Sequence, residues 1–264
     1  MECIYIIIII ILILLIFNIY NKYYIKKICN NLEYFIYGEK TPNNKTILIL
    51  GGIHGDEPAG SRAILQLMDD INTNINIKNI KLNNRLILIP YVNYCALQIN
   101  KRSVPLIGDL NRKFPSTENY NENKLHPIIK QILKFTKEAD FIIDFHEGWG
   151  YYKENNGSIG STISPTNTII SNQVTDLVYN NLNNNITEDN KKFTILTDDK
   201  NLIQNNTEKY GKNVDIKKTL RYYANIINKN YVLIETTGQN NIQELDIRIK
   251  QDRIVIDTIL NYYN

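Results

Sequence analysis

The sequence predicts an α/β protein with three layers, in which helices cover both faces of a mixed, mostly parallel central sheet. Unbroken aliphatic runs at 46–50 and 85–90 are typical of strands that are buried on both faces. Between them, residues 59–70 repeat apolar side chains at helical spacing, and a further apolar run begins at Phe141. Alternation of strand and helix is the pattern of an α/β/α domain. A chain of 264 residues with 43% hydrophobic content is large enough to bury one such core.

The chain begins with an uncharged apolar segment at residues 3–17. A helix through residues 3–20 is about 27 Å long, close to the hydrocarbon thickness of a bilayer. We therefore expect residues 1–21 to be a membrane anchor or an uncleaved signal, since no small-residue cleavage site follows the run. Lysines follow it between residues 22 and 27, and the positive-inside rule would then leave the rest of the chain in the cytosol. The side of the membrane stays open.

The remainder is predicted to be one domain. Residues 22–40 form a linker with a leading strand at 33–37, and residues 41–264 form the globular part. The stretch 151–220 is rich in Asn, Ser and Thr, which predicts long loops with one helix near 171–182. Apolar residues at helical spacing over 242–262 predict a closing helix.

Charge and cysteine content limit the function classes. Thirty basic against 27 acidic residues give a net charge of +3, which is too small to indicate a nucleic-acid-binding surface. Cys3 lies in the predicted anchor, and Cys29 and Cys95 could be free thiols or a single bridge.

The first candidate site follows the strand at 46–50. Two glycines end this strand, and His54 and Glu57 come directly after them. Open α/β sheets place their sites at the carboxyl ends of strands, and a spacing of three puts the imidazole and the carboxylate side by side. The pair is typical of half a metal site, although the same spacing also arises by chance.

A second histidine completes a ligand set. His146 ends the apolar run that begins at Phe141, and a glycine follows it closely. Two histidines and one carboxylate hold a catalytic zinc and leave the fourth position for water. We therefore expect one Zn²⁺ per chain at these three residues. Asp144 shares a strand face with His146 and is expected behind that ligand or at the strand end, and Glu147 is expected behind the ligands or at the rim.

A loop bounded by glycine and proline carries Asn111 and Arg112. A guanidinium forms a bidentate pair with a carboxylate, and an adjacent amide adds a further donor. The loop is therefore a candidate for binding a carboxylate, with a solvated basic loop as the alternative.

Taken together, these motifs resemble the zinc carboxypeptidase family, which includes murein-peptide amidases and, more distantly, the succinylglutamate desuccinylase and aspartoacylase group. The shared marks are a His-x-x-Glu pair, an upstream arginine, Asp-x-Asn-Arg, a second histidine and a late glutamate. The resemblance covers residues 46–262 and implies a zinc carboxypeptidase-like catalytic domain.

The resemblance also implies a role for each matching residue. His54, Glu57 and His146 correspond to the zinc ligands, and Asp109 corresponds to the acid that orients the first histidine. The pair that grips the substrate's terminal carboxylate corresponds to Asn111 and Arg112. The arginine that polarises the scissile carbonyl corresponds by spacing to Arg102, and the general base corresponds to Glu235. A mobile tyrosine of many family peptidases has no assignable match among Tyr210, Tyr222 and Tyr223.

Three functions follow as hypotheses. The first is a peptidase that acts on a peptide with a free carboxylate, and the second is a deacylase that releases an acyl group from an N-acyl amino acid. The third is an inactive, membrane-tethered peptide binder. The presence of Glu235 argues against the binder, because binding alone needs no general base.

Overall fold

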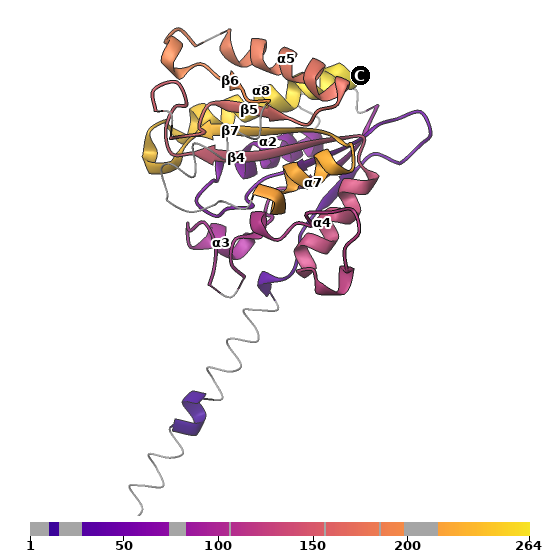
Figure 1. The fold of residues 1–264 in the computed structure, drawn as a ribbon, viewed down its shortest axis with the longest axis vertical. Helices are drawn as coiled ribbons and strands as arrows, with labels where there is room; N and C mark the ends of the chain where they lie inside the picture. The colour runs from indigo at the N-terminus through magenta and orange to yellow at the C-terminus, as the bar shows by residue number, and fades with distance from the viewer. Residues whose placement is uncertain are drawn as a thin grey trace, which may run out of the picture.

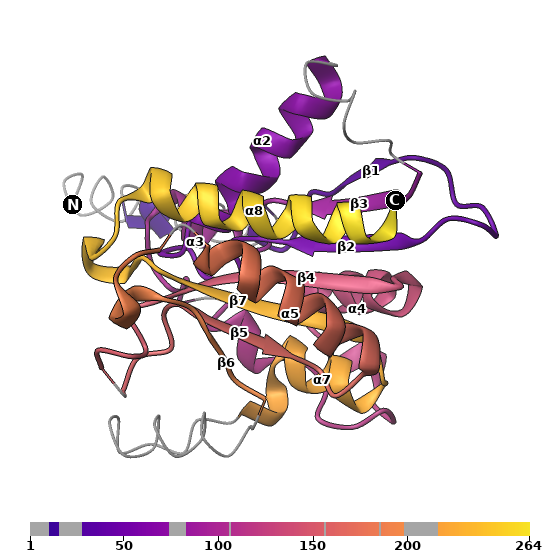
Figure 2. The same cartoon turned by 90° about the horizontal axis from the view of Figure 1, so that it is seen from above.

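The computed structural model describes residues 11–15, 28–73, 83–105, 107–155, 157–184, 186–197 and 216–264. Within these ranges, seven strands form one sheet in the order β1-β3-β2-β4-β7-β5-β6 (Figures 1 and 2). The strands are β1 (Phe35–Tyr37), β2 (Thr46–Leu50), β3 (Arg85–Ile89), β4 (Phe141–Gly148), β5 (Thr162–Pro165), β6 (Thr194–Ile195) and β7 (Asn230–Thr237). Strands β3, β2, β4 and β7 run parallel, and β6 runs parallel to β5, whereas β1 and β5 are antiparallel to β3 and β7. The mixed, mostly parallel sheet confirms the predicted fold class.

Helices cover both faces of this sheet (Figure 1). The α-helices are α2 (Ala59–Thr73), α3 (Tyr94–Gln98), α4 (Pro127–Glu138), α5 (Ile169–Asn183), α7 (Leu220–Ile226) and α8 (Leu245–Tyr263). The short 3₁₀ helices are η1 (Leu110–Arg112), η2 (Glu122–Lys124), η3 (Asp189–Lys191), η4 (Ile216–Lys218) and η5 (Gln239–Asn241). Apolar residues of α2, α5 and α8 form one core with the sheet, and those of α4 and α7 form a second core on its other face.

Strand β2 shows why the central runs carry no polar alternation. Ile47 and Ile49 belong to the core under α2, α5 and α8, whereas Leu48 and Leu50 belong to the core under α4 and α7. Successive side chains point to opposite faces, so a strand covered on both sides is apolar at every position.

The prediction for residues 151–220 was wrong in one respect. The helix expected near 171–182 is present as α5, but the segment also contributes strands β5 and β6 to the sheet. Strand β5 reads Thr-Ile-Ser-Pro, and all four residues are buried. Thr162 and Ser164 interrupt any apolar run, so no strand signal is visible in the sequence here. The hydroxyl of Thr162 can be buried because it donates to the carbonyl of Ile159 at 2.6 Å.

The N-terminal prediction falls largely outside the described residues. Of the predicted anchor at 1–21, residues 11–15 are described, and they are helical. A search of the described ranges finds no helix with the length and apolar character needed to cross a bilayer. The proposed domain boundaries stay predictions.

The two cysteines of the described part form a disulfide. Cys29 and Cys95 are joined with 5.5 Å between their Cα atoms. The bridge connects the segment before β1 to helix α3, and it selects the second of the two alternatives that the sequence left open.

Candidate metal centre and pocket

The loop between β2 and α2 brings His54 and Glu57 to the carboxyl end of the sheet. Both side chains are 2% exposed. Gly55 lies between them, where a Cβ would come within 2.0 Å of the backbone of Ala96 in α3. The loop can therefore lie against α3 only with glycine at this position.

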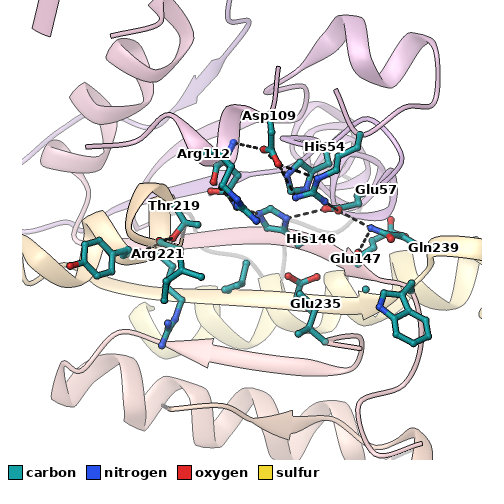
Figure 3. A pocket seen from close by; sticks show the side chains of 18 of the residues that line it. His54, Glu57, Asp109, Arg112, His146, Glu147, Thr219, Arg221, Glu235 and Gln239 are labelled. Carbon is teal, nitrogen blue, oxygen red and sulfur yellow. Dashed lines mark hydrogen bonds and ion pairs between the residues drawn. The ribbon is translucent and has the colours of Figure 1, made fainter. Parts of the chain in front are cut away.

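One carboxylate faces both histidines. The Nδ1 atom of His54 lies 2.8 Å from Oε1 of Glu57, and the Nδ1 atom of His146 lies 2.9 Å from Oε2 (Figure 3). One ligand atom from each of the three buried residues lies within 4.8 Å of the others. Two imidazole nitrogens and a carboxylate oxygen at this separation fit the donor set of a tetrahedral zinc site with one open position.

Each histidine also has its own aspartate. Nε2 of His54 lies 3.2 Å from Oδ1 of Asp109, and Nε2 of His146 lies 3.5 Å from Oδ2 of Asp144. An Nε2–H that donates to a carboxylate fixes the tautomer with a free lone pair on Nδ1, which is the atom that faces Glu57. The structure thus places Asp109 and Asp144 behind the two predicted ligands.

Charge within the cluster is largely compensated. Burial alone would raise the pKa of Glu57, but His54 and His146 hold that pKa well below its ordinary value. Burial likewise opposes ionisation of Asp109, whose pKa is nevertheless lowered by His54 and Arg102. Both carboxylates are therefore ionised at neutral pH and available to a cation or an imidazole N–H.

Arg102 lies at the edge of this cluster. Its Nε and Nη2 atoms donate to Oδ2 of Asp109 at 3.1 and 3.0 Å, and Nη1 lies 3.4 Å from Oε1 of Glu57. The structure therefore brings Arg102, which was matched by spacing alone, next to the predicted metal ligands.

Glu235 reaches the same pocket from the neighbouring strand. In the β4–β7 ladder its Cα pairs with that of His146. The residue is 5% exposed, and burial raises the pKa of its carboxyl to about 8, with His146 opposing and Glu57 adding to the shift. In Figure 3 its side chain points toward the cluster.

Asn111 and Arg112 lie in η1 and line the pocket. Oδ1 of Asn111 accepts from the backbone N–H of Leu220 at 3.1 Å, and its Nδ2 lies 3.4 Å from Nε2 of His146. Arg112 donates from Nη1 to the carbonyl of Asn111 at 2.7 Å. The amide of Asn111 thus joins η1 to the start of α7, in addition to facing the cluster.

These residues enclose a cavity of about 410 Å³. Apolar and aromatic side chains form part of its wall, among them those of Trp149, Ile159, Ile216, Tyr222 and Leu233. Of the three tyrosines left unassigned by the sequence, Tyr222 lines the cavity, Tyr223 is buried in the core, and Tyr210 lies outside the described residues.

Three contacts at the site were missed by sequence reasoning. The hydroxyl of Tyr231 donates to Oδ2 of Asp144 at 2.8 Å, and Nε2 of Gln239 lies 3.0 Å from Oε1 of Glu57. Arg221 lines the cavity and donates from Nη2 to the carbonyl of Pro165. Tyr231 could have been found from the sequence. Side chains alternate between the two faces of a strand, and Tyr231, four residues before Glu235 on β7, lies on the same face as Glu235.

Glu147 is among the residues that line the cavity, but its carboxylate is bound by groups of α2 and α8. It is 2% exposed, its Oε1 accepts from the N–H of Ala59 at 2.6 Å, and its Oε2 pairs with Arg248 of α8. Its carboxylate therefore lies behind the predicted ligands.

The mixed sheet and the buried His/Glu/His cluster agree with the zinc carboxypeptidase-like fold that the sequence predicted. Residues 43–153 match the model of the succinylglutamate desuccinylase/aspartoacylase catalytic domain. This segment contains both histidines of the cluster, Glu57 and the loop with Asn111 and Arg112. The resemblance stated from the sequence is thereby confirmed. A comparison with curated protein sequences finds no match.

Solved structures share the fold. The tripeptide-bound cell shape determinant Csd4 from Helicobacter pylori matches with a TM-score of 0.65 and 19% identity, over 89% of this chain and 56% of Csd4. A protein from Shewanella amazonensis, classed provisionally as a metallopeptidase, matches with a TM-score of 0.60 and 15% identity, over 88% of this chain and 82% of that one. The ectoine utilization protein EutE (DoeB) from Ruegeria pomeroyi, in a product-bound form, matches with a TM-score of 0.51 and 19% identity, over 84% of this chain and 59% of EutE. This chain thus spans little more than half of Csd4.

Proposed function

We propose that this chain is a zinc-dependent hydrolase that cleaves an amide bond next to a free carboxylate, as a carboxypeptidase or peptide amidase does. The observation that carries the proposal is the convergence of His54, Glu57 and His146 with Glu235 around one cavity. The fold shared with Csd4, described in its mDAP-bound form as a D,L-carboxypeptidase, supports a peptide substrate.

The chain's own residues account for the proton transfers. Zinc, when bound, supplies Lewis acidity and lowers the pKa of an attacking water towards about 7. Glu235 accepts the proton of that water and delivers it to the leaving nitrogen. Burial raises the pKa of the Glu235 carboxyl to about 8, and a dication held by the three ligands would lower that pKa and favour the carboxylate form that accepts the proton. Arg102 presents a guanidinium to the oxygen on which negative charge develops.

Asn111 and Arg112 bind the carboxylate end of the substrate. Both line the cavity, and η1 places them beside His146. Once Nε2–H of His146 donates to Asp144, the Nδ2 group of Asn111 has no acceptor in that imidazole and can turn to a substrate oxygen.

Deacylation of an N-acyl amino acid is the second candidate. The match of residues 43–153 to the succinylglutamate desuccinylase/aspartoacylase model favours it. The bond, the metal ligands and the base are the same in both reactions, and only the group on the acyl side differs. An inactive peptide binder would need no buried carboxylate at Glu235.

A substrate panel tests the proposal. Purified full-length chain is assayed with peptides that carry a free or amidated C-terminus and with N-acyl amino acids, each with and without a zinc chelator. Chelator-sensitive hydrolysis of peptides supports the first function, and hydrolysis confined to N-acyl amino acids supports the second. An inactive parent across the panel would favour the binder.

Replacement of Arg112 by alanine is expected to weaken the selection for the free carboxylate. A hydrogen bond to a charged group contributes about 1.5 to 3 kcal/mol, so the preference for the free acid over its amide should fall by about 10-fold or more. The ratio of kcat/KM values for the two substrates measures this effect. Lys113→Ala, at the adjacent residue outside the cavity lining, is the matched control. If Arg112→Ala keeps the parental ratio, the carboxylate is bound elsewhere.

The location of the domain is a further part of the proposal. We propose that residues 1–21 attach the chain to a membrane and that the domain works in an oxidising compartment. The bridge between Cys29 and Cys95 supports the second point, because disulfides persist mainly outside the cytosol. The positive-inside rule, applied to the lysines that follow this segment, instead favours the cytosolic side.

Peptide mapping of the natively isolated chain tests this placement. After alkylation without reductant, the peptides that contain Cys29 and Cys95 are expected to elute as one linked species. They should separate on reduction. Recovery of both cysteines fully alkylated without reductant would place the domain in a reducing compartment.

A further inference from the structure

Glu147 and Arg248 form a buried pair directly behind the metal cluster. The two side chains are 2% and 5% exposed. Glu147 follows His146 on β4, so the alternation of a strand turns its side chain to the opposite face. Arg248 comes from α8, one of the helices that cover that face.

The carboxylate of Glu147 holds the segment that carries Glu57. Its Oε1 accepts from the N–H of Ala59 at 2.6 Å, and Ala59 is the first residue of α2, two positions after Glu57. The N-terminus of a helix of this length favours a carboxylate, because its first N–H groups have no partner within the helix. The strand that carries His146 is thus joined to the loop that carries the other two ligands.

A second connection runs through the backbone of the same residue. The carbonyl of Glu147 accepts from Nε2 of Gln239 at 2.8 Å, and this Nε2 also lies 3.0 Å from Oε1 of Glu57. The preceding residue is Gly238, where a Cβ would come within 1.6 Å of Oε2 of Glu147. A side chain at this position would therefore displace the ends of Glu147 and Arg248.

Arg248 is turned toward Glu147 rather than toward the other nearby acid. Asp252 lies one turn further along α8 and is fully buried, yet neither of its oxygens has a hydrogen-bond partner among the described residues. Glu147 is therefore the carboxylate that holds the guanidinium in place.

Buried ion pairs are poor stabilisers, because desolvation offsets much of their attraction. A role beyond stability is therefore expected where one joins two halves of a ligand set. We propose that Glu147 is a positioning residue, which with Arg248 holds Glu57 and His146 at the separation that zinc requires. The inference rests on the metal site of the proposed function.

Zinc titration of the full-length, metal-free chain tests this role. The apparent Kd for Zn²⁺ is measured by competition with a chelator for the parent and for Glu147→Gln, which keeps the size of the side chain but removes its charge. Residues that orient metal ligands typically change metal affinity by about 10- to 100-fold, and a loss in this range is expected. The melting temperature of each metal-free protein is recorded in parallel.

The matched control is Arg253→Gln. Arg253 also lies on α8 and pairs with Asp70 of α2 at 2.9 Å, so it joins the same two helices without contacting the cluster. It is expected to lower the melting temperature and leave the zinc Kd within about twofold of the parent, whereas Glu147→Gln should change both.

A second variant covers the case in which Glu147→Gln does not fold. Arg248→Lys keeps the buried charge balanced but loses the planar guanidinium, so it should weaken zinc binding in the same direction by a smaller factor. A parental Kd in the folded Glu147→Gln chain, or in Arg248→Lys when only that variant folds, would overturn the inference. A parent that binds no zinc would instead overturn the proposed function itself.

Discussion

Replacement of Glu235 by glutamine lowers kcat by at least about 100-fold, the lower end for a positioned acid or base. The amide has the size of the carboxyl group but cannot accept the proton of the attacking water. Because Glu235 is not among the three metal ligands, zinc content and substrate binding should stay near the parental values. Single-turnover kinetics, zinc analysis and substrate titration measure the three quantities separately, once the substrate panel has given an active parent.

The same exchange at a position outside the cavity provides the control. Glu138 pairs with Arg85 away from the cavity, so Glu138→Gln should leave turnover unchanged. Near-parental turnover by Glu235→Gln would show that Glu235 is not the general base. Another acid of the cavity would then have to take that role.

Replacement of His146 by alanine is expected to remove most of the zinc. His54 and Glu57, two ligands from one loop, would remain, and the site would have two open positions instead of one. We expect the zinc content of the purified chain to fall from about one equivalent to about a tenth or less, because a catalytic zinc is held by three protein ligands and only two would be left. Metal analysis after gel filtration measures it.

His126 offers a matched histidine outside the cluster. It caps α4, where its Nδ1 accepts from the N–H of Ile128 at 3.4 Å. His126→Ala should keep the parental zinc content and lose only some stability. A full equivalent of zinc in His146→Ala would show that the metal, if present, is bound elsewhere.

The clustering of the three proposed ligands could be predicted from sequence because each residue follows a local signal. His54 and His146 come at the ends of apolar runs, and the structure shows these runs as the adjacent parallel strands β2 and β4. Parallel neighbours end at the same edge of a sheet, so the order of elements along the chain was sufficient to bring the two histidines together.

The supporting residues could not be predicted in this way. Gln239 and Arg248 approach the cluster from a turn and a helix whose positions depend on the packing of the whole domain. No spacing rule connects Arg248 to Glu147, since the contact depends on how α8 lies across the sheet. Strand β5 escaped prediction for a different reason, because it buries Thr162 and Ser164, whose hydroxyl groups break the apolar pattern of a buried strand.

The register of β4 against β7 also affects the order in which the site can be completed during folding. Pairing of β2 with β4 brings together the segments that carry all three metal ligands, whereas Glu235 joins them only when β7 adds to β4 and its Cα pairs with that of His146. A slip of one residue in that last pairing would turn Glu235 to the opposite face of the sheet. Parallel pairing between distant segments forms slowly, because loop closure precedes any gain from contacts. In the proposed hydrolase, a nascent chain would therefore bring its metal ligands together before Glu235 joins them, so metal binding would precede hydrolytic activity.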